Sequence, residues 1–454
     1  MYVAFDDTDS TEGMCTTFLA TEMILGLADL DLIGLPRLVR LNPAVPWKTR
    51  GNGAVCLRFG KGRGGKWPVG GINDEPIYSH AECAREPDIG SVLDTCSGIL
   101  KEWSRVGEGA SPGLVVSKRK PPQWIYWSTV RRITRKADVL SDLKRLGART
   151  ASLAGGRGIV GASAAMAWRP RDRTYEVLAY REKDRWGTER EVSPGTVEEL
   201  DSLFPSTFNN YDHIASRPAI TPNSPCPVLF GIRGDALEDL VPAMSSIRSE
   251  PVDRWLLFLT NQGTDDHIIT DWDRLVPGSS YSVEGEVTGR PETFKGGHVV
   301  FQLLPDRGGA LLDCAAYEPS KHFRDTVRLL APGDRVQVFG EVRKEPRTLN
   351  IEKLHVTSLA EVSRKGANPS CPVCGKRMKS VGVGQGYRCR RCGSKAPPGA
   401  AELVAVPREI AIGWYEPPVC SRRHLSKPLK RLPPSAHASV DCRSTDNIQI
   451  ETKS

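Results

Sequence analysis

Residues 1–10 of the chain read MYVAFDDTDS, a short apolar run followed at once by Asp6, Asp7 and Asp9. The apolar run, residues 2–5, predicts a buried β-strand, which puts the three carboxylates at its end. Like charges so close together are costly unless a cation or hydrogen-bond donors compensate them. Magnesium takes oxygen ligands and can join carboxylates to phosphates, so the stretch predicts a metal and phosphate site. The alternative is an acidic surface turn that caps the next helix.

The residues that follow favour the phosphate site. Residues 12–17, EGMCTT, put hydroxyl groups, including that of Thr16, at the start of a predicted apolar helix over 17–30. The free amides and the positive dipole end of a helix attract phosphate. Predicted strands at 37–41 and 54–59 flank a second loop, whose candidate nucleotide-binding residues are Lys48, Arg50, Asn52 and Gly53.

Two further glycine-rich stretches are less specific. Gly155, Gly156, Arg157 and Gly158 precede the small-residue stretch 160–167 and could form a nucleotide loop, although each such cluster alone is more typical of a plain loop. Residues 60–66, GKGRGGK, predict a flexible basic loop. Their spacing does not match a Walker A sequence, so a phosphate-binding loop is the less favoured interpretation.

The middle of the chain predicts two more folding units. Strands expected at 227–232 and 254–260 enclose a helix over 235–247, which suggests a ferredoxin-like unit. Residues 281–356 alternate as three strands, a helix and two strands, the element order of an OB-fold that binds oligonucleotides. A small SH3-like barrel that serves as a spacer is the alternative.

Four of the twelve cysteines form two CxxC pairs, Cys371 with Cys374 and Cys389 with Cys392. Two such turns can bring four thiolates to one point, which is the tetrahedral environment that zinc prefers. We therefore predict a zinc ribbon rather than a redox or disulfide pair. With four protein ligands, the metal has no open position and is expected to be structural.

Charge and hydropathy limit the class of protein. From Glu361 to the end there are 17 Lys and Arg but 7 Asp and Glu, so the excess positive charge lies in the last fifth of the chain. This favours a polyphosphate partner, although a solvated basic tail is an equal alternative. No apolar run is long enough for a membrane helix and no signal peptide is visible, so we expect a cytoplasmic protein that does not contact membranes.

Several long motifs resemble one family. DDTDS with GMCTT, RLNPAVPWKTRGNGAV, GGRGIVGASAA, AYREKDRWGTER, PNSPCPVLFGIRG, EPVDRWLLFLTNQGTD, CAAYEPSKHFRDTVRLLAPGD, the CxxC pairs and SRRHLSKPLKR are similar, in this order, to the archaeal isoleucine-tRNA 2-agmatinylcytidine synthetases. The matches run from residue 4 to about 431. Residues 60–76 and those after Arg431 lie outside these matches.

The resemblance implies a multidomain α+β protein. It implies a kinase-like catalytic domain over 1–200, a ferredoxin-like domain over 201–272, an OB-fold over 273–360, a zinc ribbon over 361–400 and a basic C-terminal tail over 401–454.

It also implies a ligase. ATP, with magnesium, activates the oxygen at carbon 2 of the wobble cytidine in isoleucine tRNA with a CAU anticodon, and the amine of agmatine displaces it. The products are 2-agmatinylcytidine, AMP and pyrophosphate, and the tRNA then reads AUA instead of AUG.

By the same resemblance Thr16 is the threonine that the family phosphorylates, with its neighbour Thr17 as the alternative. Asn210 and Asp212 are the candidates for binding agmatine, whose guanidinium pairs well with a carboxylate, and helix capping is their alternative role. The dispersed histidines receive no catalytic role.

Two other classes of protein remain open. One is a nucleic-acid-binding protein without activity, in which the barrel and ribbon bind and the N-terminal half is a scaffold. The other is a small-molecule kinase with an RNA-binding appendage.

Overall fold

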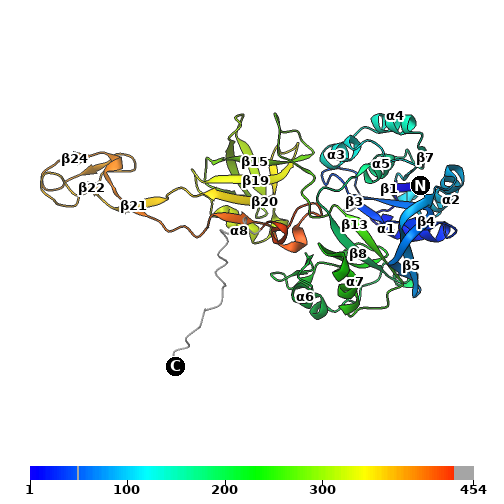
Figure 1. The fold of residues 1–454 in the computed structure, drawn as a ribbon. Helices are drawn as coiled ribbons and strands as arrows, with labels where there is room; N and C mark the ends of the chain where they lie inside the picture. Colours follow the sequence, from blue (N-terminus) through cyan, green and yellow to red (C-terminus); the bar gives the residue numbers. More distant parts are fainter. Residues whose placement is uncertain (49–50, 434–454) are drawn as a thin grey trace, which may run out of the picture.

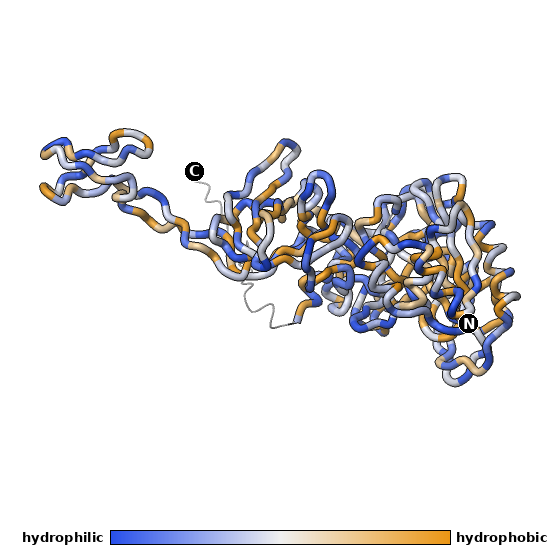
Figure 2. Tube along the Cα trace, turned by 90° about the horizontal axis from the view of Figure 1, so that it is seen from above, coloured by the Kyte–Doolittle hydropathy of each residue, from blue (hydrophilic) through white to orange (hydrophobic). Residues whose placement is uncertain are grey.

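The computed structural model describes residues 1–48 and 51–433 of the chain. Figure 1 shows an α/β part at one end of an elongated molecule, a β-barrel in the middle and a small β-ribbon at the far end. The view from above in Figure 2 shows the same order, with the ribbon separated from the barrel by a thin connection. This arrangement confirms the predicted multidomain α+β class.

An eleven-stranded sheet organises the α/β part, and its main path runs β7-β6-β1-β4-β3-β13-β8-β12-β9. The first half of the α/β part contains β1 (Tyr2–Asp6), α1 (Thr16–Gly26), β2 (Asp31–Ile33), β3 (Arg37–Arg40), β4 (Gly53–Ile72), β5 (Glu75–Arg85), α2 (Ile89–Trp103), β6 (Gly113–Ser117), α3 (Trp124–Arg131), α4 (Lys136–Leu146), β7 (Arg149–Ser152) and α5 (Ile159–Ala167). The second half of the α/β part contains β8 (Thr174–Tyr180), α6 (Pro194–Leu203), β9 (Thr207–Phe208), β12 (Val228–Gly234), α7 (Leu237–Ser246) and β13 (Arg254–Thr260), with β10 (Tyr211–Asp212) and β11 (Arg217–Pro218) as a separate pair. The two halves share one sheet because β13 pairs in parallel with β3 and antiparallel with β8.

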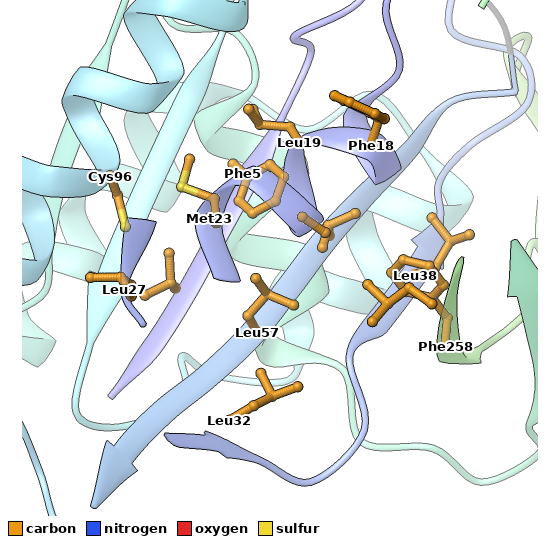
Figure 3. Close-up of a cluster of buried hydrophobic side chains, with 14 of the residues drawn as sticks. Phe5, Phe18, Leu19, Met23, Leu27, Leu32, Leu38, Leu57, Cys96 and Phe258 are labelled. Atoms are coloured by element: carbon orange, nitrogen blue, oxygen red, sulfur yellow. The ribbon is translucent and has the colours of Figure 1, made fainter. Parts of the chain in front are cut away.

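Helices cover both faces of this sheet. Successive strand residues point to opposite faces, so Val3 and Phe5 of β1 pack with α1 and α2, whereas Ala4 packs with α3, α4 and α5. Figure 3 shows side chains of α1 and α2, including Phe18 and Cys96, gathered over Phe5 and neighbouring strands. The end of β1 is thereby held between two helical layers.

The structure corrects the prediction of a flexible loop over residues 60–66. These residues lie inside β4, which pairs antiparallel with β5 along most of its length. The strand accepts glycines because their missing side chains leave room for the partner strand: a Cβ at Gly62 would lie 2.4 Å from the ring of His80. Backbone pairing therefore outweighs the high glycine content.

The predicted barrel is confirmed. Five strands close in the order β15-β17-β18-β20-β19, and β19 pairs again with β15. The strands and the helix between the third and fourth are β15 (Ser279–Val287), β17 (Val299–Pro305), β18 (Leu312–Ala316), α8 (Phe323–Arg328), β19 (Arg335–Val342) and β20 (Leu349–Ser358), with β14 (Ile268–Ile269) and β16 (Glu292–Thr293) as short additions. This is OB-fold topology.

A two-stranded arm, β21 (Ser363–Ala367) with β25 (Glu402–Ala405), carries the ribbon away from the barrel. The ribbon has three short strands, β22 (Lys379–Ser380), β23 (Tyr387–Arg388) and β24 (Lys395–Ala396). The Sγ atoms of Cys371, Cys374, Cys389 and Cys392 all lie within 4.8 Å of one another. Thiolates about 2.3 Å from a tetrahedral zinc ion occupy such positions, so the residues present fit the predicted metal.

After the ribbon the chain returns to the α/β part. We call residues 413–433 the C-terminal strap; it begins with β26 (Gly413–Tyr415), which pairs with β20. Further along, Lys427 and Arg431 form ion pairs of 2.6 and 2.9 Å with Asp172. Of the expected basic tail over 401–454, residues 402–405 form the exposed second strand of the arm and residues 413–433 form the strap, part of whose charge is neutralised by carboxylates elsewhere in the chain.

The barrel, the strap and the α/β part meet at a buried ion network. Glu352 of β20 lies 2.8 Å from His267 and 3.4 Å from Arg423 of the strap. Lys353 beside it pairs with Asp265 at 2.7 Å. Burial alone would raise the pKa of Glu352, but Arg423 and His267 outweigh it and lower that pKa from 4.5 to about 2.

Among the described residues, no helix is both long and apolar enough to cross a membrane.

Removing zinc should unfold the ribbon alone. Its own apolar cluster is small, with Met378 and Tyr387 beside two of the cysteines, so metal binding must supply most of its folding free energy. We expect chelation, or Cys389→Ser, to abolish amide hydrogen-exchange protection over 371–396 and to leave the α/β sheet protected. Cys83→Ser, in β5, is the matched control. Protection of the ribbon that persists without metal would contradict this expectation.

Glu352→Gln should remove a pH-dependent part of the stability. Because the pKa of Glu352 is lower in the folded protein, its contribution is complete above about pH 4.5 and is lost as the pH falls toward about 2. We expect wild type to exceed the variant by about 3 kcal/mol in urea unfolding at pH 6, with the difference shrinking toward pH 3. The exposed Glu361→Gln is the control. A constant difference across this pH range would disprove the role of this carboxylate.

Candidate active site

A cavity of about 760 Å³ lies where the first and second halves of the α/β part and the strap come together. The wall includes residues from the end of β1, the start of α1, the 41–53 loop, residues 217–224, and residues 419–424 of the strap. Segments from opposite ends of the sequence therefore line one space.

Asp6, Asp7 and Asp9 all line this cavity, as expected for the end of β1. Asp6 is only 8% exposed. Its burial, and then the charges of Asp7 and Asp9, raise the pKa of Asp6 well above its ordinary value. A cation that bound here would lower this electrostatic cost.

Helix α5 approaches the acidic end of β1 closely because two glycines replace larger residues. A Cβ at Gly158 would lie 2.3 Å from the backbone oxygen of Asp6, and one at Gly161 would lie 1.8 Å from its carboxylate. Any side chain at these positions would push the helix away. The glycines therefore have a packing role.

Of the predicted glycine loop, Arg157 reaches the cavity, whereas Gly155, Gly156 and Gly158 do not line it. Arg157 Nε donates to Asp7 Oδ2 at 2.7 Å. Gly155 and Gly156 have positive φ angles of 89° and 61°, which glycine adopts without strain. The loop thus positions one guanidinium against the acidic cluster.

Thr16 and Thr17 both line the cavity at the start of α1. The Thr16 hydroxyl accepts a hydrogen bond from Thr8 Oγ1 at 3.0 Å. The Thr17 hydroxyl lies 3.1 Å from the Cys15 thiol. The two hydroxyls therefore have different neighbours, although their burial is the same.

In the second predicted loop, Lys48, Asn52 and Gly53 line the cavity. The Lys48 ammonium donates to the carbonyl of Pro43, and Asn52 Nδ2 donates to the carbonyl of Asn42 at 2.8 Å. Arg50, the other predicted cation, lies outside the described residues.

The predicted agmatine residues do not line the cavity, although Asn209 beside them does. Asn210 is buried and donates to Thr207 Oγ1 at 2.7 Å. Asp212 is also buried; although burial opposes it, the amides of Ala215, Cys420 and Ile214 lower the pKa of its carboxyl. Asp212 thus links the strap, through the amide of Cys420, to this wall of the cavity.

Sequence reasoning missed a charged cluster that borders the cavity. Glu176 of β8 is fully buried and accepts from Arg233 Nε at 2.9 Å and from Gln262 Nε2. Arg40 lies 3.7 Å from the same carboxylate, and His424 of the strap lies 3.0 Å from Gln262. A single acid within the apolar strand TYEVLAY was the available signal, since such a charge needs internal partners.

The cavity carries charges of both signs. Among the described residues, its carboxylates are Asp6, Asp7, Asp9 and Glu176, and lysine and arginine side chains outnumber them. Such a space suits a phosphorylated ligand with a cation at the acidic end.

Within the described ranges, one group of three or more His, Cys, Asp or Glu side chains lies close enough together to hold a metal ion. This group is the four ribbon cysteines. Asp6, Asp7 and Asp9 form no such closed group.

Three family models match the chain. The TiaS TCKD domain matches residues 2–155, the TiaS FLD domain matches residues 156–267, and the TiaS C-terminal zinc ribbon domain matches residues 368–410.

Complete relatives are also similar. A protein of Archaeoglobus fulgidus named as TiaS, the 2-agmatinylcytidine synthetase of an isoleucine tRNA, is 38% identical, with 95% of this chain and 97% of the relative covered. A relative of the same name from Methanosarcina mazei is 39% identical, with the same coverage. The crystal structure of TiaS in complex with this isoleucine tRNA and ATP has a TM-score of 0.82 and 37% identity, with 96% of this chain and 98% of that chain covered. The chain therefore belongs to TiaS, the family of isoleucine-tRNA 2-agmatinylcytidine synthetases.

Proposed function

We propose that this protein attaches agmatine to carbon 2 of the wobble cytidine in isoleucine tRNA with a CAU anticodon, at the expense of ATP. The observation that carries the proposal is the single cavity in which an acidic strand end, threonine hydroxyls and cations converge in a chain of this family. Solved relatives include one complex with isoleucine tRNA and ATP, and another with the tRNA, AMPCPP and agmatine. The modified tRNA then reads AUA instead of AUG.

The chemistry requires the oxygen on carbon 2 to become a leaving group. Bonding it to a phosphorus atom of ATP, as a P–O–P bond of ATP breaks in exchange, achieves this, because a phosphate group departs far more easily than an oxide. The free amine of agmatine then forms the carbon–nitrogen bond, the carbon–oxygen bond breaks, and the oxygen leaves with its electron pair on the phosphorus group. The attacking nitrogen loses its extra proton. Overall, we propose that ATP yields AMP and pyrophosphate.

Magnesium, when bound, would neutralise phosphate charge at the acidic end of β1. Asp6 and Asp9 would supply oxygen ligands there, and Arg157, already oriented by Asp7, would contact phosphate oxygens. Lys48, Asn52 and Gly53 would complete the nucleotide site, and Arg50 belongs to the same loop.

We assign the phosphorylated hydroxyl to Thr16 rather than Thr17. Thr16 is hydrogen-bonded to Thr8, which belongs to the acidic segment, whereas Thr17 lies beside Cys15. For agmatine, Asn210 and Asp212 would act by position: they hold residues 207–212 and Cys420 so that Asn209 faces the cavity.

The proposed reaction predicts a defined product. Incubation with CAU-anticodon isoleucine tRNA, ATP, magnesium and agmatine should convert the wobble cytidine to a nucleoside heavier by agmatine minus water, as measured by nucleoside mass spectrometry. Asp7→Asn should lower the rate by about 100-fold or more, because it removes the charge that orients Arg157 and faces the phosphates. Asp29→Asn, an exposed position away from the cavity, should be as active as wild type.

The outcomes separate the three classes of protein. A binding protein without activity gives no mass change and is indifferent to Asp7→Asn, and a small-molecule kinase consumes ATP without tRNA. ATP labelled at the α-phosphate should yield labelled AMP at an appreciable rate only when tRNA is present. Labelled ADP would contradict the proposed fate of ATP.

A further inference from the structure

His424 of the strap is a cavity residue without a role in the reaction as proposed. The side chain is exposed, and it lines the cavity rather than the outer surface. Its backbone is fixed, because its carbonyl accepts from the amide of Gly263 at 2.8 Å. The imidazole is therefore presented to the ligand space by a segment that follows the ribbon in sequence.

The hydrogen-bond network decides which ring nitrogen carries the proton. Glu176 can only accept, so Gln262 directs its Nε2 toward that carboxylate and its Oε1 toward His424. An amide oxygen also only accepts, so His424 Nδ1 must donate to it over 3.0 Å. In the neutral ring, Nε2 then has a lone pair that can accept a hydrogen bond.

The surroundings of the ring favour its neutral form. Desolvation by the cavity wall, and then the positive charges of Arg40, Arg233 and Lys48, lower the pKa of His424 well below its ordinary value. The Nε2 atom lies close to Arg40: a Cβ at Gly51 would lie 2.9 Å from His424 Nε2 and 2.9 Å from Arg40 Nη1. An acceptor and a donor therefore lie side by side at the cavity wall.

The acceptor on His424 and the donor on Arg40 together determine which kind of chemical group can bind. A cationic donor, such as the ammonium or guanidinium of agmatine, is repelled by Arg40 and Arg233. A neutral amine with an adjacent acceptor is suited to both partners. Cytosine presents this pattern as its exocyclic amine next to N3, whereas uracil presents the opposite pattern, with an oxygen next to an N–H group.

We propose that His424 Nε2 accepts a hydrogen bond from the exocyclic amine of the target cytosine, and that the strap thereby takes part in choosing the base. This inference rests on the proposed function and adds the residue that recognises the base. Glu176 and Gln262 are positioning residues, because they act through the His424 tautomer. Recognition at the amine leaves carbon 2, on the other side of N3, free to react.

The test combines substitution of the His424 side chain with removal of the exocyclic amine from the wobble base. His424→Asn can keep a donor near Gln262 but loses the acceptor, and His424→Gln can place an amide oxygen near the position of Nε2. The substrates are two isoleucine tRNAs, one with the natural wobble cytidine and one whose wobble pyrimidine keeps the carbonyl at carbon 2 but has hydrogen in place of the amine. The measured quantity is kcat/KM for tRNA.

With wild type, loss of the amine should lower kcat/KM on the order of 10- to 100-fold. His424→Asn should show a similar loss with natural tRNA but little further loss with the tRNA that lacks the amine. His424→Gln should recover part of the activity with natural tRNA alone. The KM for ATP should stay unchanged in every case, and His80→Asn, outside the cavity, should behave as wild type.

Losses that multiply when enzyme and substrate changes are combined would overturn the inference, because they show that the two groups do not interact. So would a wild-type enzyme indifferent to the missing amine, or an effect confined to the KM for ATP, which would place the adenine of ATP at His424. Failure of wild type to modify natural tRNA would instead refute the proposed function. Thermal unfolding of each variant identifies a folding defect, and the wild-type comparison of the two tRNAs is independent of it.

Discussion

The position of one carboxylate determines the rest of the site. Asp6 is buried at the end of β1, between the charges of Asp7 and Asp9 and a helix that comes close only because positions 158 and 161 are glycine. Such a group is unfavourable in isolation, and a folded protein keeps it where a bound cation or donor can use it. The two-sided packing of the sheet fixes β1, and Arg157 then orients Asp7.

The strap brings basic side chains to the cavity that contains this acidic end. It leaves the ribbon, pairs with the barrel at β20, and brings Arg422, Arg423 and His424 to the cavity. The ion network around Glu352 and the pairs to Asp172 hold it in place. One continuous segment therefore joins the barrel to the cavity.

Local patterns were sufficient to predict several of the elements and several of the groups that meet in the cavity. Alternation predicted the barrel strands, the CxxC spacing predicted the four converging thiols, and the position of Asp6, Asp7 and Asp9 after an apolar run predicted their place at a strand end. The family resemblance added the order of domains. These features depend on residues close together in sequence.

Long-range contacts could not be predicted in this way. Glu176, Arg233, Gln262 and His424 come from four separate segments, and only tertiary pairing brings them together. The same limit explains the 60–66 stretch, whose glycines suit a loop locally but pair with β5 in the sheet. It also explains the strap, whose positive charges are matched by carboxylates far away in the sequence.

We propose that the acidic end of β1 holds the metal and phosphates that activate the base. The most direct measurement is a crystal structure of this protein with magnesium and a non-hydrolysable ATP analogue. We expect metal density in contact with a carboxylate of the Asp6–Asp9 cluster and phosphate oxygens beside Arg157. Phosphates bound elsewhere, with this end of the strand unoccupied, would contradict it.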